Sequence, residues 1–114
     1  MKIEKSSNIS KSPVEIDGAK DVEIRWLISE KDGAKNFAMR MFELQPGGHT
    51  PLHTHPQEHE VFVLEGQGTF VFEGQEHPFG AEYVVFVPPN TEHRFMNTGE
   101  TVLRMLCIIP ISPA

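Results

Sequence analysis

The chain has 114 residues, a length that fits one domain with its own hydrophobic core. Sixteen acidic against ten basic residues give a formal net charge of −6, which repels phosphate backbones, so we expect no nucleic-acid partner. Because no stretch approaches the roughly 20 apolar residues of a membrane span and the N-terminus is too polar for a secretory signal, we expect a cytoplasmic protein without membrane contact.

Strand patterns recur along the chain, and helical patterns hardly appear. Residues 1–13 are polar and are expected to form a loose arm, or a strand that adds to another sheet, ahead of a single domain at 14–114. Gln45 to Gly48 is a turn by composition, and Gly74-Gln75 should close a hairpin. Nine prolines and nine glycines among short strands indicate an all-β sandwich or barrel of the jelly-roll kind. The predicted strands are 22–28, 37–44, 59–64, 69–73, 82–87, 93–96 and 102–109.

The arrangement of the histidines is the strongest indication of function in the sequence. His53 and His55 lie two residues apart, so in an extended segment both project from one face and can share a metal ion. His59 and the distant His93 extend the pattern. The alternative is a group of surface histidines that flank a proline. The other two histidines, His49 and His77, lie next to turns and are interpreted as surface residues.

The segment from Gly47 to Gly66 resembles the first conserved motif of the cupin superfamily. That motif runs glycine, five residues, His-x-His, three or four residues, glutamate, six residues, glycine, and Gly47, His53 and His55 fit it directly. The second cupin motif is matched by Gly80, Pro88, His93 and Asn97. Asn90 replaces a turn glycine of the family, and Asn also tolerates positive φ. The resemblance covers about residues 47 to 97 and implies a jelly-roll barrel (double-stranded β-helix) with a metal ion inside.

His59 occupies the position where most metal cupins carry a glutamate, and Glu60 is one place late. Residues 53, 55 and 59 share odd parity, although Pro56 weakens an argument from alternation. Both residues therefore stay candidates for the ligand position, with His59 favoured. By resemblance, His53, His55, His59 and His93 would hold one divalent ion per subunit: Mn, Fe, Ni, Cu or Zn.

Two classes of function fit these residues. The first is a metal-dependent, dioxygenase-like oxidoreductase that binds a small enol, diketone or catechol-like substrate through two oxygens, with Glu60 as a base near the ion. The second is a non-catalytic small-molecule binding or sensing module. A cupin isomerase is a further alternative, since the fold alone does not determine the reaction.

Arg40 interrupts the apolar run Ala38 to Phe42. An inward-facing Arg40 could anchor an anionic substrate, whereas an outward one would pair with a carboxylate. Aromatic residues, methionines and Cys107 in the predicted strands should fill the core, and some should line the cavity. Cys107 is the only cysteine, so no disulfide can form within one chain.

Several predicted strands are apolar on both faces, above all Val102 to Ile109. A second apolar face suggests a homodimer packed sheet on sheet, unless loops and the N-terminal arm cover it. Arg104 marks the even positions of this strand as the outer face, so Leu106 should face outwards.

Overall fold

The computed structural model describes residues 1–111, which form one curled antiparallel sheet without an α-helix. This confirms the predicted all-β jelly roll. No helix of the described residues is long and apolar enough to cross a membrane. Two short 3-10 turns lie at Ser6–Asn8 (η1) and Glu30–Asp32 (η2). The strands are β1 (Ser12–Pro13), β2 (Lys20–Ile28), β3 (Phe37–His49), β4 (His59–Glu65), β5 (Gln67–Phe72), β6 (Gln75–Gly80), β7 (Val84–Val87), β8 (His93–Met96) and β9 (Leu103–Pro110).

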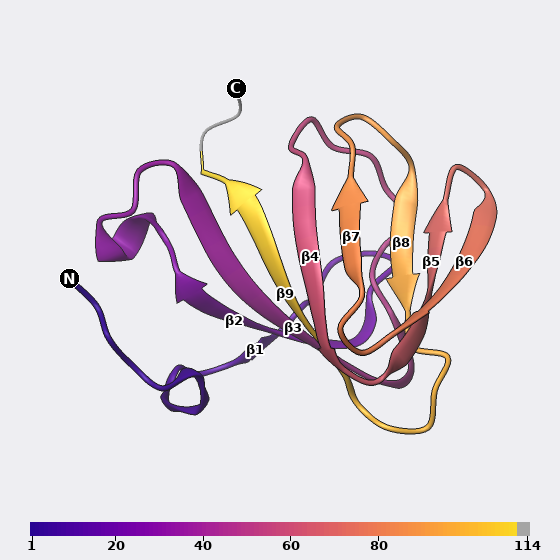
Figure 1. Cartoon of the computed structure of the whole chain (residues 1–114), viewed down its shortest axis with the longest axis horizontal. Helices are drawn as coiled ribbons and strands as arrows, with labels where there is room; N and C mark the ends of the chain where they lie inside the picture. Colours follow the sequence, from indigo (N-terminus) through magenta and orange to yellow (C-terminus); the bar gives the residue numbers. More distant parts are fainter. Residues whose placement is uncertain (112–114) are drawn as a thin grey trace.

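Strands distant in sequence lie side by side in this sheet. Its order is β6-β5-β8-β3-β9-β4-β7, with β2 also paired to β3 and β1 to β2 (Figure 1). The long strand β3 connects the two halves of the sheet because Phe37 to Leu44 pair with β9, while His49 pairs with Met96 of β8. The curl directs one face of the sheet towards a common interior, where the core lies.

Alternation of side chains separates this interior from an outer face. On β4, His59, Val61 and Val63 are buried, whereas the residues between them are exposed. On β9, Met105 and Cys107 are buried and the even positions are half-buried. The prediction that the even positions of β9 face outwards is therefore confirmed.

Two predictions of local structure were wrong. The strand expected to end at Leu44 continues to His49, and Gln45 to Gly48 form a bulge opposite β2 rather than a turn. A Cβ at Gly48 would lie 2.8 Å from the carbonyl oxygen of Lys20, so glycine permits this close approach. The second strand of the hairpin at Gly74, β6, was also missed; its Pro78 is tolerated because β6 pairs only with β5.

The N-terminal residues run beside β2, the strand at this end of the sheet. β1 pairs with β2, and Lys2 donates to the carbonyl of Leu27 at 2.7 Å. The arm therefore adds to the sheet of its own chain. The last three residues of the predicted 14–114 domain lie outside the described residues.

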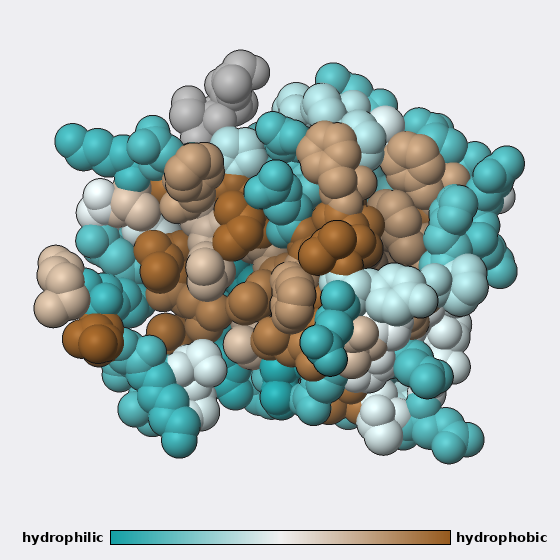
Figure 2. Space-filling view, in the orientation of Figure 1, coloured by the Kyte–Doolittle hydropathy of each residue, from teal (hydrophilic) through white to brown (hydrophobic). Residues whose placement is uncertain are grey.

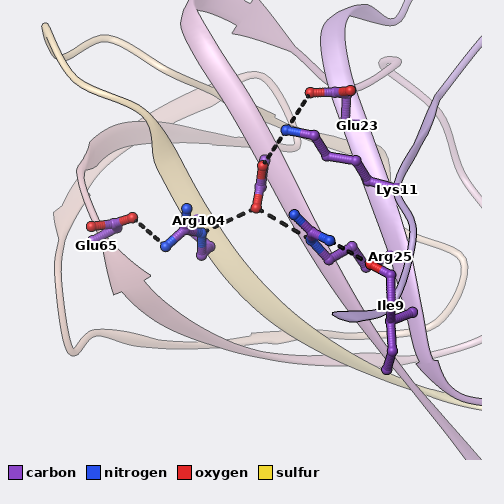
Figure 3. A network of polar contacts seen from close by, with 7 residues as sticks. Ile9, Lys11, Glu23, Arg25, Glu65 and Arg104 are labelled. Atoms are coloured by element: carbon purple, nitrogen blue, oxygen red, sulfur yellow. Dashed lines mark hydrogen bonds and ion pairs between the residues drawn. The ribbon is translucent and has the colours of Figure 1, made fainter. Parts of the chain in front are cut away.

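An ion-pair network fastens this arm to the outer face (Figure 3). The carboxylate of Glu43, which is 5% exposed, lies 3.2 Å from Lys11 Nζ and 3.2 Å from Arg104 Nε. Arg25 Nε is 3.6 Å away, and the Arg25 guanidinium also donates to the carbonyl of Ile9. Burial opposes ionisation of Glu43, but the hydrogen bond from Lys11 and the nearby positive charges hold its pKa below the usual value. The network thus pairs the buried carboxylate of Glu43 with three cationic side chains.

Candidate metal site

Three segments bring four histidines to one end of the interior. His53 and His55 lie in the loop between β3 and β4, His59 begins β4, and His93 begins β8. Backbone hydrogen bonds between His53 and His93, at 3.1 and 3.2 Å, join the loop to β8. The backbone N–H of Asn90 donates to the carbonyl of His55 at 2.8 Å. Asn90 has a φ of 61°, which confirms that asparagine serves as the turn residue here.

The four imidazole rings converge. Donor nitrogens of His53, His55 and His93 lie within 4.8 Å of one another. Metal–nitrogen bonds of about 2.0–2.1 Å place neighbouring ligands of a tetrahedral or octahedral ion roughly 3.0–3.4 Å apart, so the most distant nitrogens of this set would move closer together on binding an ion. His59 is not in that closest set, but its ring stacks on His55 at 4.3 Å between centroids. The geometry is thus compatible with a three-histidine metal site that has a fourth histidine beside it.

Hydrogen bonds at Nδ1 fix the orientation of two of the rings and so aim their Nε2 atoms, which would bind the ion. His55 Nδ1 lies 2.8 Å from the carbonyl of Gln57, and His93 Nδ1 lies 2.9 Å from the carbonyl of Thr91. A carbonyl oxygen can only accept a hydrogen bond, so each Nδ1 donates, and in the neutral ring Nε2 is left with a free lone pair. The Nε2 atoms of His55 and His59 are buried without a hydrogen-bond partner. Buried nitrogens in this state fit a metal ion well.

The electrostatics of the site favour the neutral ring at His53, His59 and His93. Burial, together with the charge of Arg40, lowers the pKa of His59 to about 3. Burial also lowers the pKa of His53 and of His93. Neutral imidazole is the form that coordinates a metal, so these three rings can bind an ion at neutral pH without losing protons.

A cavity of about 170 Å³ opens next to these rings. Its walls are mainly apolar and come from β2, β3, β4, β8 and β9, with Phe42, Val61, Phe95 and Met105 among them. Arg40 faces this cavity and is 9% exposed, which decides between the two orientations that the sequence left open. Nη2 of Arg40 donates to the sulfur of Cys107 at 3.0 Å, and that sulfur is 3.4 Å from His59 Nδ1. Burial raises the pKa of the Cys107 thiol, although Arg40 opposes the shift.

Glu60 is not brought to the site. It is exposed on the face of β4 opposite His59 and lines an outer groove with Phe62 and Phe86. A ligand or base role at the cavity, as the sequence allowed, does not fit this position. Asn97 also stays away from the rings: its Nδ2 donates to the carbonyls of Leu44 at 2.8 Å and Thr101 at 2.9 Å, which stabilises the turn that follows β8.

The remaining histidines do not line the cavity. His77 is exposed, as predicted, and His49 is half-buried beside the Thr50 carbonyl. Sequence reasoning missed two cavity residues, Val14 and Ile16, which precede β2. Their spacing of two indicates a shared face, but the pair lies next to the polar arm, where no strand is predicted from the sequence.

Comparison with known proteins agrees with this architecture. Residues 40–109 match the cupin domain family Cupin_2, so the chain belongs to the cupin family. The oxalate-binding protein of Thermotoga maritima is 36% identical over 96 residues, which are 81% of this chain and 78% of that protein. The polyketide synthase CurC of Streptomyces cyaneus is 31% identical over 71% of this chain, but the match covers only 54% of CurC.

Solved structures show the same fold over nearly the whole chain. The polyketide cyclase RemF from Streptomyces resistomycificus has a TM-score of 0.92 and 33% identity, covering 98% of this chain and 80% of RemF. A predicted oxalate decarboxylase from Thermotoga maritima has a TM-score of 0.86 and 30% identity, covering 97% of this chain and all of that chain, 100%.

Proposed function

We propose that this protein is a metal-binding cupin that binds a small organic molecule through two oxygens on an ion held by His53, His55, His59 and His93. The observation that carries the proposal is that the Nε2 atoms of His55, a member of the converging set, and of His59, which lies beside it, are buried without a hydrogen-bond partner. When bound, a redox-active ion would supply oxygen chemistry and Zn would supply Lewis acidity. The apolar walls would exclude water, and the carbonyls behind His55 and His93 would hold those rings in place.

The relatives support the ligand class. Oxalate, which the Thermotoga relative is named for, has two adjacent carboxylates, and polyketides carry alternating carbonyls. Both can offer two oxygens to one ion. A small chelating ligand of this type suits a cavity of about 170 Å³, which is close to an engineered cavity of roughly 150 Å³ that holds benzene.

We propose dioxygenase-like oxidation as the reaction and non-catalytic binding as the second candidate. The residues of 1–111 that line the cavity include no Asp or Glu, so proton transfer would fall to histidines or Cys107. This composition disfavours an isomerase and leaves chemistry that relies on the ion. Oxygen uptake by protein loaded with Mn, Fe, Ni or Cu, tested with small diketones and catechols, separates the candidates: tight binding without oxygen uptake would support the binding module.

Metal content tests the proposal directly. Wild-type protein should contain one divalent ion per chain and gain melting temperature on loading, because a ligand of the folded form stabilises it. The double variant His53→Ala, His55→Ala should lose both properties. A matched variant, His77→Ala, changes an exposed histidine and should keep them. Full metal occupancy in the double variant would contradict the proposal.

We also propose that two copies pack through the outer face of β4, β7 and β9. Phe62, Val84 and Phe86 are 41%, 76% and 56% exposed, and they border a groove with Leu106 and Ile108. Figure 2 shows a broad brown and tan area across the face on which these strands lie. The arm covers the outer face near Arg25 and Glu43 instead, so it leaves this area open.

A further inference from the structure

Arg40 is a buried cation without an anionic partner. The ion pairs of the described residues do not include it, although Glu43, three positions along the same strand, takes part in three. Its Nε atom is buried without any hydrogen-bond partner, and its Nη2 atom bonds only to a sulfur. The positive charge is therefore present in the cavity without neutralisation.

The surroundings of Arg40 compensate little of this charge. Its Cζ lies 5.0 Å from the ring centroid of Phe42 and 5.6 Å from that of Trp26. Such aromatic contacts and one weak sulfur acceptor return much less free energy than burying a cation costs. The cavity lining contains no Asp or Glu among residues 1–111, and a metal ion among the histidines would add more positive charge. A ligand that carries negative charge would relieve this imbalance.

We propose that Arg40 is the anion-binding residue of the cavity and that the ligand is a small organic carboxylate with a compact apolar body. The carboxylate would accept hydrogen bonds from the guanidinium edge whose Nε is unpartnered. Val22, Ile24, Phe42 and Phe95 would surround the apolar part. This inference narrows the ligand class of the proposed function, and it depends on that proposal only in taking the cavity as the ligand site.

Benzoate and its neutral analogue benzamide are suitable probes, because they differ mainly in charge. Titration calorimetry on metal-free protein at pH 8 should show benzoate binding more tightly than benzamide. Arg40→Met should weaken benzoate binding about 10- to 100-fold, the usual range for loss of a charge-assisted hydrogen bond, and leave benzamide binding unchanged. Arg40→Lys, which keeps the charge, should retain part of the preference.

The melting temperature gives a second readout that a structural arginine would not produce. Because Arg40 lacks a counter-ion, Arg40→Met should melt at the same or a higher temperature than wild type. Arg94→Met is the matched control: Arg94 also has a buried unpartnered Nε, but it lies outside the cavity lining, so its loss should not affect benzoate binding.

Equal binding of benzoate and benzamide by the wild type, or unchanged benzoate binding in Arg40→Met, would overturn the inference. A large drop in melting temperature in Arg40→Met would overturn it as well, since it would make Arg40 a structural residue. Separate metal analysis keeps the two proposals apart. Arg40-dependent binding in a protein that takes up no metal would leave this inference standing and remove the proposed function.

Discussion

Each face of β3 carries one buried charged side chain, but only the one on the outer face is paired with opposite charges. On the outer face, the carboxylate of Glu43 lies within 4 Å of Lys11, Arg25 and Arg104 (Figure 3). On the inner face, Arg40 has no acidic partner and shares its cavity with histidines. Both side chains are at most 9% exposed, so burial alone does not distinguish them.

The difference indicates what each region is for. A buried charge that is fully paired holds its partners in a fixed geometry, and the loss of one partner destabilises the folded chain, which is the role we assign to Glu43 as the anchor of the N-terminal arm. A buried charge or donor atom left unpaired costs stability, and such groups concentrate at functional sites. Arg40, with the Nε2 atoms of His55 and His59, falls in the second group.

The largest effect on stability is expected from the paired face. Glu43→Gln should lower the free energy of unfolding by about 3 kcal/mol at pH 7, because it removes the buried acid that Lys11, Arg25 and Arg104 share. Among the ion pairs of the described residues, Arg25 has no other acidic partner, whereas Lys11 keeps Glu23 and Arg104 keeps Glu65. The control is Glu65→Gln, which removes only the 2.7 Å contact of an acid that is 48% exposed with Arg104 and should cost less than about 1 kcal/mol. Urea denaturation measures both. If both variants lost the same free energy of unfolding, the buried Glu43 network would contribute no more to stability than an exposed ion pair.

Much of the site could be predicted from the sequence because it depends on spacing. His53, His55 and His93 were identified from the motifs, and odd parity favoured His59 over Glu60 as the inward residue. Leu106 was assigned to the outer face of β9 for the same reason. Within a regular strand, alternation carries this information well. The role of Glu60 as a base near the ion was also expected, and its outward position does not support that role.

Features that depend on tertiary contacts were not predictable. Arg40 lies between apolar neighbours on both sides, so its pattern fits either face equally. The bulge at Gln45 to Gly48 looks like a turn, because glycine and proline serve both structures. The contact of Cys107 with Arg40 and His59 joins β9 to two strands that are distant in sequence.

The next prediction concerns the pH dependence of stability, which should differ between the inner face, with His59, and the outer face, with Glu43. Metal-free His59 stays neutral when folded because its pKa is lowered from 6.5 to about 3, while the unfolded chain takes up a proton. The unfolded state then binds more protons, so stability falls as pH drops below 6.5, by roughly 2 kcal/mol between pH 7.5 and pH 5. His59→Leu should remove this part of the loss. Other buried histidines with lowered pKa should leave a residual slope.

Glu43 titrates in a different range. Its folded pKa is lowered below 4.5, so its contribution is present above that pH and is lost only on further acidification. Glu43→Gln should therefore keep the wild-type difference between pH 7.5 and pH 5. Urea denaturation of metal-free protein at the two pH values checks both variants; a wild-type difference in His59→Leu would contradict this account of the inner face.

The smallest effect on the stability of one subunit is expected at the outer groove. Leu106→Glu would place a charge near the symmetry axis of the proposed dimer, where two copies repel and cannot be hydrated. Light scattering should show a dimer for wild type and a monomer for this variant. Ile3→Glu, on the exposed arm, is the control and should remain a dimer. A wild type that is monomeric at micromolar concentration would contradict the dimer.

Neighbouring residues of β4 allow the most direct test of the central claim, that unpartnered groups of the inner face bind the ion. His59 faces inwards with a free Nε2, and Glu60 faces outwards. Competition with a chelator should show that His59→Ala weakens binding of the divalent ion by at least about 10-fold. Glu60→Ala should change it by less than about twofold, because an outward side chain cannot support a ligand. Equal effects, or a larger effect of Glu60→Ala, would contradict the account.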